Sequence, residues 1–203
     1  SAVGSLLVVV KKPKSNVVSL RDGMLIVSLS WLIASLTSCI PFMLSGAIPN
    51  FSEAFFESIS GFTTTGASIL NDVESLPRGI VFWRSFTHWI GGMGILVFAI
   101  AILPSLGING LRIADAEAPG PTFDKITAKT SDSAKILYLM YVGMTILETI
   151  LLMLGGMNLF DALVHTFGTV GTGGFSSYNN SILHFNSLYI ELVMGVFMVA
   201  AGT

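Results

Sequence analysis

The chain has 203 residues, of which 52% are hydrophobic and only 11% charged, with a mean hydropathy of +0.78. This balance lies outside the usual composition of a soluble domain of similar length and favours lipid as the solvent. The net charge of −2 says little, because the basic residues are clustered. We expect no nucleic-acid partner. The single cysteine, Cys39, excludes an intrachain disulfide.

Four apolar stretches are long enough to cross a bilayer, whose hydrocarbon core of about 30 Å needs about 20 mostly apolar residues. They predict membrane spans at residues 24–44, about 79–103, about 135–156, and from about 187 to the end of the chain. The last stretch is still apolar at Thr203, and residues 5–10 look like the end of an earlier helix. We therefore expect the chain to be part of a longer one.

Basic residues favour cytoplasmic loops, and eight of the ten fall before the first span or between the second and third. Residues 41–77 and 157–186 contain no lysine or arginine, so we expect them outside. The predicted organisation is a preceding helix end and cytoplasmic linker, a first helical unit, a cytoplasmic loop, and a second helical unit truncated at its C-terminus. These parts cover residues 1–22, 23–103, 104–134 and 135–203.

An internal repeat appears when the chain is shifted by 108 positions without a gap. Identical residues then coincide along both outer segments, namely Asn50 with Asn158, Ala54 with Ala162, Thr64 with Thr172, Gly66 with Gly174, Ser68 with Ser176, and Asn71 with Asn179. Because both copies start and end inside, the repeats are parallel. The predicted fold is an all-α membrane protein with two helix–pore loop–helix units.

Each outer segment consists of a short amphipathic stretch followed by threonine and glycine. Asn50 or Ser52 is a suitable cap for a helix ending near Phe62, and residues 161–170 repeat the plan. Threonine is a poor helix former and glycine adopts backbone angles closed to other residues, so irregular backbone is expected next. At membrane depth such backbone is tolerated only inside protein or beside a watery cavity.

The carbonyl oxygens of this irregular backbone are suited to coordinating a dehydrated monovalent cation. Carboxylates, which calcium and magnesium sites normally use, are absent from both stretches. The candidate selectivity filter consists of Thr63, Thr64, Thr65, Gly66, Ala67, Gly171, Thr172, Gly173, Gly174 and Phe175.

A few ionisable residues lie among these apolar segments. Glu57 and His165 are equivalent under the 108-residue shift, and we expect them to support the filters from behind. Glu148 is expected to face the helix bundle, bonded to Thr145 or a neighbouring loop; ion contact is the alternative. We expect Arg84 and His88 to pack against other helices or to anchor the second span at the membrane interface. Close helix packing, or a flexible point, is expected at residues 91–94.

Other classes of protein fit less well. A secondary transporter would also use broken helices, but those folds commonly have inverted repeats. No His-Glu-x-x-His motif or convincing Ser/His/Asp set lies in the spans, so we expect neither an enzyme nor an organic cofactor. Residues 168–174 are glycine-rich, yet they follow no strand and lack the lysine of a phosphate-binding loop.

Three strings resemble the Trk/Ktr/HKT family of potassium transporters, most of all its bacterial TrkH and KtrB membrane subunits. They are SISGFTTTGAS at residues 58–68, HWIGGMG at residues 88–94, and ALVHTFGTVGTGGFS at residues 162–176. The resemblance covers nearly the whole chain. It implies a potassium-channel-like arrangement of four such units, of which this chain has the first two, with Gly66 and Gly174 as filter glycines.

The resemblance also implies a function and partners. Potassium is the expected transported ion, held at Thr64, Thr65, Gly66, Thr172, Gly173 and Gly174 and taken up across the bacterial plasma membrane. A less selective or ion-coupled transporter of monovalent cations, using sodium or protons with potassium, is the alternative. Membrane lipid, a homodimer and a cytoplasmic nucleotide-binding regulatory subunit are the expected partners, and residues 115–129 are the hypothetical docking site for the last.

Overall fold

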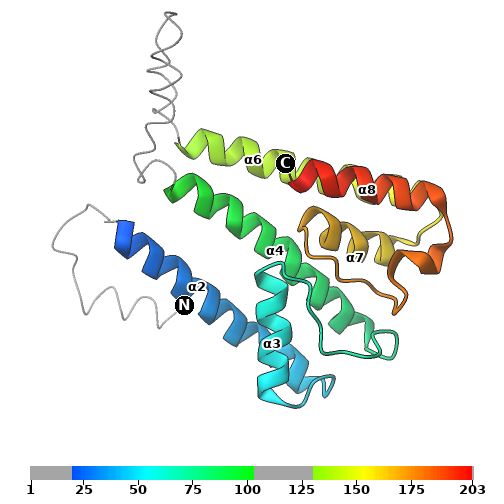
Figure 1. The fold of residues 1–203 in the computed structure, drawn as a ribbon, viewed down its shortest axis with the longest axis horizontal. Coiled ribbons are helices and arrows are strands. Elements are labelled where there is room, and N and C mark those ends of the chain that lie inside the picture. Colours follow the sequence, from blue (N-terminus) through cyan, green and yellow to red (C-terminus); the bar gives the residue numbers. More distant parts are fainter. Residues whose placement is uncertain (1–19, 103–129, 203) are drawn as a thin grey trace, which may run out of the picture.

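The computed structural model describes residues 20–102 and 130–202, and every regular element in these two stretches is a helix. Figure 1 shows them as two successive groups along the chain. The helices are α2 (Leu20–Leu44), α3 (Phe51–Phe62), α4 (Arg78–Ile102), α6 (Thr130–Leu154), α7 (Leu159–Val170), the short 3-10 helix η2 (Ser181–Phe185) and α8 (Leu188–Gly202).

The four expected spans correspond to α2, α4, α6 and α8, and their ends agree within a few residues. The short helices α3 and α7 have 12 residues each. Helix α7 begins and ends 108 residues after α3, which is the shift seen in the sequence. The expected linker at residues 1–22 and the cytoplasmic loop at residues 104–134 lie mostly outside the described residues, as does the hypothetical docking site. The unit boundaries therefore stay predictions.

Both short helices begin in the same way. Asn50 accepts a hydrogen bond from the Ser52 amide, and Asn158 accepts one from the Asp161 amide, so each asparagine caps its helix. An acidic side chain follows in the first turn of each helix, where the positive end of the helix dipole favours negative charge. The expected asparagine cap at residue 50 is confirmed.

Each unit has its own small apolar core. One cluster includes Cys39, Phe42 and Ala54, and the other includes Leu152, Ala162 and Ile190. The alanines occupy equivalent positions under the shift, and neither exposes any surface. A larger side chain at either position would push the short helix off its neighbours.

The two units meet along α4, which packs on α3 of its own unit and on α6 and α7 of the second. Helix α7 is therefore enclosed by α4, α6 and α8, whereas α3 packs on α2 and α4 alone among the described helices. Figure 1 shows this difference: α7 lies within the group of helices and α3 lies at its edge. The short helices are thus repeated in sequence but differ in surroundings.

Within the described residues, two segments pass a length and composition test for crossing a membrane, Val27–Leu44 in α2 and Ile136–Leu154 in α6. Large apolar side chains project from both of them; Ile33 is 59% exposed and Leu139 is 73% exposed. Surfaces of this kind are stable against lipid and unfavourable in water. Helix α4 matches α2 and α6 in length, at 25 residues.

Candidate functional site

The same backbone path follows both short helices. We call residues 63–68 the first loop and residues 171–176 the second loop. In the first loop, the amides of Thr63, Thr64 and Thr65 turn back to the carbonyl oxygens of Ile59, Gly61 and Ser60, at 2.9, 3.1 and 3.0 Å. The amides of the second loop make the three equivalent bonds, each 108 residues further on, at 3.1, 2.9 and 2.8 Å.

The backbone angles repeat as well. Thr64 and Thr172 have φ of 53° and 57°, and Gly66 and Gly174 have φ of 73° and 85°. Threonine is rarely found with positive φ, since its branched side chain crowds the backbone there. Two threonines held in this conformation at equivalent positions indicate a geometry that the surrounding structure enforces.

This path leaves most carbonyl oxygens of the two loops without a hydrogen bond to the described chain. The loop amides are used to close the end of the helix, but within the described chain the carbonyl oxygens of residues 63–66 and 171–175 accept no hydrogen bond. Several residues of the two loops, among them Thr63, Thr65, Thr172 and Gly174, are exposed in the described chain, so water or an ion can be the partner of these oxygens. A dehydrated cation is such a partner.

The two loops touch each other. A Cβ atom added to Gly66 would overlap the carbonyl oxygen of Gly173, so the first loop runs directly against the second. The equivalent position, Gly174, has no atom within 4 Å of an added Cβ. The structure therefore brings the two sets of candidate filter residues together, and only glycine fits at Gly66.

Glu57 lies behind the first loop with no exposed surface. Its carboxylate accepts hydrogen bonds from the Ser68 hydroxyl at 2.9 Å and from the Ile69 amide at 3.1 Å. A third bond comes from Nε of Arg84 at 2.6 Å, which makes an ion pair. The carboxylate thus ties the end of the first loop to its short helix and to α4.

His165 holds the second loop in the equivalent way. Its Nε2 lies 3.0 Å from the hydroxyl of Ser176, the residue that matches Ser68, and its Nδ1 lies 2.8 Å from the Asp161 carbonyl oxygen. The carbonyl can only accept, so Nδ1 carries the proton and the Ser176 hydroxyl donates to Nε2. Glu57 and His165 therefore occupy matching places behind the two loops.

Comparison with known proteins identifies a family. Residues 1–203 match the family described as TrkH, cation transport protein. The chain belongs to the TrkH family. The Trk system potassium uptake protein TrkH of Escherichia coli K12 is 41% identical over 99% of this chain and 42% of its own length. TrkG of the same organism is 41% identical over 90% of the chain and 38% of its own length.

A solved structure has the same fold. The potassium transporter TrkH from Vibrio parahaemolyticus superposes with a TM-score of 0.76 at 36% identity, covering 92% of this chain and 37% of that one. The chain spans about two fifths of the length of the curated TrkH relatives it matches. It is thus a TrkH-family chain that corresponds to part of its relatives' length.

Arg84 and His88 do more than pack. The Arg84 guanidinium lies 3.5 Å from the centre of the Phe175 ring and donates to the Ser176 carbonyl oxygen at 3.4 Å. His88 stacks on the same ring at 3.9 Å, and its Nδ1 lies 2.7 Å from the Gly61 carbonyl oxygen. One indication of an ion pair here was present in the sequence, because Arg84 is a basic residue inside an apolar span and Glu57 is an acid in the same unit.

The expected bond between Glu148 and Thr145 is wrong. Glu148 has no exposed surface, as expected of a residue facing the bundle, but neither of its oxygens has a hydrogen-bond partner among the described residues. The Thr145 hydroxyl instead donates to the Tyr141 carbonyl oxygen and accepts from the Trp89 indole. The Thr169 side chain lies near the Glu148 carboxyl group, but its hydroxyl donates to the His165 carbonyl oxygen. Neither hydroxyl therefore has a proton left to donate to the Glu148 carboxyl group.

Residues 91–94 lie at close contacts, as packing requires. An added Cβ at Gly91 would overlap the Phe62 carbonyl oxygen, where α3 ends, and one at Gly92 would lie 3.1 Å from Cα of Gly171, where α7 ends. A Cβ atom added at Gly94 would lie 3.2 Å from the Trp31 ring. The glycines of α4 thus allow both short helices to end against this helix.

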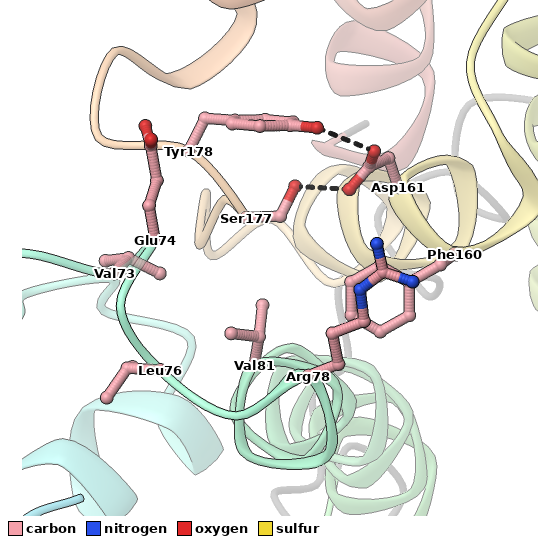
Figure 2. A pocket seen from close by; sticks show the side chains of 9 residues that line it. All are labelled: Val73, Glu74, Leu76, Arg78, Val81, Phe160, Asp161, Ser177 and Tyr178. Atoms are coloured by element: carbon pink, nitrogen blue, oxygen red, sulfur yellow. Dashed lines mark hydrogen bonds between the residues drawn. The ribbon is translucent and has the colours of Figure 1, made fainter.

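A pocket of about 250 Å³ lies where the two units meet beside the start of α7 (Figure 2). On one wall, Asp161 accepts hydrogen bonds from the hydroxyls of Ser177 and Tyr178, at 2.8 and 2.9 Å. Burial and the bond to the carboxylate raise the pKa of Tyr178 above its ordinary value of 10.0. The Arg78 guanidinium lies 5.6 Å from the Phe160 ring on the other side.

Asn179 joins the two units at the edge of this pocket. Its side chain accepts from the Val73 main-chain N–H at 2.7 Å and donates to the Asp72 carboxylate at 2.9 Å. Its main-chain N–H donates to the Glu74 carboxylate at 3.1 Å. The sequence showed that Asn179 repeats Asn71, but not that it binds the first unit. No periodicity predicts a bond across more than 100 positions.

Proposed function

We propose that the chain supplies two loops of a selectivity filter through which potassium is taken up across the bacterial plasma membrane. The observation that supports this most is the repeated set of free carbonyl oxygens in the two adjoining loops. The curated relatives are named for potassium uptake, and this chain is similar to them along 99% of its length. We assign the ion contacts to Thr64, Thr65, Gly66, Thr172, Gly173 and Gly174.

The chemistry of the loops favours a monovalent ion. Their available ligands are carbonyl oxygens and threonine hydroxyls, which replace the hydration shell of an ion without a full negative charge that would hold it too tightly. Both short helices end at their loops, so the negative ends of the helix dipoles face the place where a cation would lie. Glu57 and His165 support the loops and do not contact the ion in this proposal.

The orientation and partners belong to the same proposal. The loops face the outside, and the lysine- and arginine-rich segments face the cytoplasm. We propose a homodimer and a cytoplasmic nucleotide-binding regulatory subunit as partners; the docking site for the latter lies outside the described residues.

The test is uptake of tracer rubidium into liposomes that contain the full-length protein, with potassium or sodium as competitor. We expect potassium to compete at much lower concentration than sodium. Equal competition would change the proposal to a less selective cation pathway. Absence of uptake above that of protein-free liposomes would refute it.

Glu148 favours a second candidate, transport of potassium coupled to another ion. A buried carboxyl group with no hydrogen-bond partner among residues 20–102 and 130–202 is a candidate carrier for a proton that moves with the transported ion. If uptake is coupled to protons, Glu148→Gln should remove the dependence of rubidium uptake on a pH gradient. If Glu148 only packs as a neutral group, the glutamine variant should transport as the wild type does, because glutamine has nearly the same shape.

A further inference from the structure

One side chain is linked to the residues that follow both candidate filter glycines, through Glu57 in the first unit and directly in the second. Arg84 is 3% exposed and projects from α4 of the first unit. Its Nε pairs with Glu57, which in turn holds Ser68 and Ile69 after Gly66. Its other nitrogens lie against the residues after Gly174 in the second unit. A single guanidinium therefore connects the two loops.

The second-unit end of this connection is held on two faces. Arg84 and His88 are one helical turn apart on α4 and both contact the Phe175 ring, at 3.5 and 3.9 Å. The hydrogen bond from Arg84 to the Ser176 carbonyl oxygen fixes the backbone of the next residue. Ser176 is also the residue that His165 holds from the other side. The end of the second loop is thus held between α4 and α7.

Within residues 20–102 and 130–202, this connection is made from the first unit and is not repeated in the second. The positions equivalent to Arg84 and His88 in α8 are Leu192 and Val196, which are apolar and 60% and 65% exposed. The position equivalent to Phe175 in the first loop is Ala67. The repeat therefore keeps the backbone of the loops and changes the side chains that connect one unit to the next.

From this geometry we infer that Arg84 is a positioning residue that sets the second loop against the first and so determines the selectivity of the filter. The inference rests on the proposed function. Guanidinium is suited to this place because its planar fork donates to a carboxylate and a carbonyl oxygen while its face stacks on an aromatic ring. Lysine keeps the charge but cannot make all three contacts.

The experiment must separate positioning from folding. Arg84→Met alone would leave the Glu57 carboxylate buried without its cation, which is strongly destabilising and could prevent folding. The variant to use is the neutral pair, Arg84→Met with Glu57→Gln, since glutamine still accepts from Ser68 or Ile69. Arg78→Met is the matched control. It makes the same chemical change in the same helix, but Arg78 is exposed and contacts neither loop.

Two readouts are taken on the full-length protein in lipid nanodiscs or liposomes. The first is hydrogen–deuterium exchange of residues 171–178, which does not depend on transport. We expect exchange to be about tenfold faster in the neutral pair and unchanged in the Arg78 control, since charge-assisted contacts to the loop are lost. The second is the preference for potassium over sodium in rubidium competition, which we expect to fall about tenfold in the neutral pair alone.

The outcomes are distinct. Unchanged exchange of residues 171–178 in a folded neutral pair would overturn the inference, whatever the transport result. Faster exchange with an unchanged ion preference would overturn the role in selectivity. If the wild-type protein shows no preference for potassium, the proposed function fails, while the exchange measurement still decides whether Arg84 positions the loop. Arg84→Lys, made with Glu57 unchanged, should give values of both readouts between those of the wild type and of the neutral pair. This result would support the positioning role of Arg84.

Discussion

Helices α3 and α7 show how one local plan is used in two environments. Both have 12 residues, an asparagine cap, an acid in the first turn and a loop with the same turn-back hydrogen bonds. Yet α7 is enclosed by α4, α6 and α8, and nine of its residues are buried, against six in α3. The local sequence is therefore sufficient for the shape of the loops, and the neighbours decide how firmly each is held.

The side chains behind the loops follow this difference. In the second unit, His165 and Asp161 hold residues 176–178 from within α7 itself. In the first unit, Glu57 makes the equivalent contact to Ser68 but also needs Arg84 from α4. The ion pair with Arg84 offsets the cost of burying the charge of Glu57, whereas a neutral histidine needs no such partner. Substitutions at matched positions can test whether the two loops depend on their neighbours unequally.

The largest difference is expected between Gly66→Ala and Gly174→Ala. Both glycines have positive φ, so alanine costs about 1–2 kcal/mol of backbone strain at either position. At Gly66 the new Cβ would also overlap the Gly173 carbonyl oxygen, whereas at Gly174 the space is open. We expect Gly66→Ala to abolish the preference for potassium over sodium in rubidium competition and Gly174→Ala to reduce it only partly. Equal losses would show that the contact between the loops is unimportant.

A smaller difference is expected between Asp161→Asn and Glu53→Gln, which neutralise equivalent acids in the first turns. Asp161 is 4% exposed and binds Asn158, Ser177 and Tyr178, whereas Glu53 is exposed and makes no hydrogen bond within the described chain. Loss of a hydrogen bond to a charged group costs about 1.5–3 kcal/mol, and an exposed substitution stays within about 0.5 kcal/mol. Thermal unfolding in detergent measures both; an equally destabilised Glu53→Gln would contradict the comparison.

The sequence predicted the elements of the fold well, because each has a local cause. Apolar stretches of sufficient length gave α2, α4 and α6, and the 108-residue repeat gave two short helices with equivalent ends. Glu57 and His165 were placed behind the loops because the repeat aligned them. The repeat also aligned Gly66 with Gly174, and glycine readily adopts the positive φ found at both positions.

Contacts between the units could not be predicted in this way. Arg84 reaches Phe175, and Asn179 reaches Val73, only because α4 packs on α7. No spacing in the chain encodes that packing. The predicted bond between Glu148 and Thr145 was wrong for a related reason. Thr145 is near Glu148 on the same helix, but its hydroxyl already binds the Trp89 indole and a backbone carbonyl oxygen.

A third pair, Asn179→Ala and Asn71→Ala, tests the outer contact between the units. The Asn179 side chain makes two hydrogen bonds, to Val73 and Asp72, which alanine removes, whereas the side chain of its equivalent Asn71 makes none to the described chain. The bond from the Asn179 main-chain N–H to Glu74 is kept in the variant. The bonds are partly or wholly exposed, so we expect Asn179→Ala to lower the free energy of unfolding by about 1 kcal/mol. Asn71→Ala should leave it unchanged. A destabilised Asn71→Ala in the full-length protein would mean that this asparagine binds a part of the molecule beyond the described residues.

The smallest effect concerns acid. The hydrogen bond from Asn179 holds the pKa of Asp72 below its ordinary value of 3.8. A group whose pKa is lower in the folded state contributes stability above its unfolded pKa, and loses it as the pH falls through the folded value. The wild-type protein should therefore lose its advantage over Asn179→Ala only partly, and only below about pH 4. Unfolding temperatures of the two proteins between pH 3 and pH 7 test this. A gap that stays constant over the whole range would show that the bond from the Val73 amide to the Asn179 side chain, and not the bond to the Asp72 carboxylate, makes the difference between the two proteins.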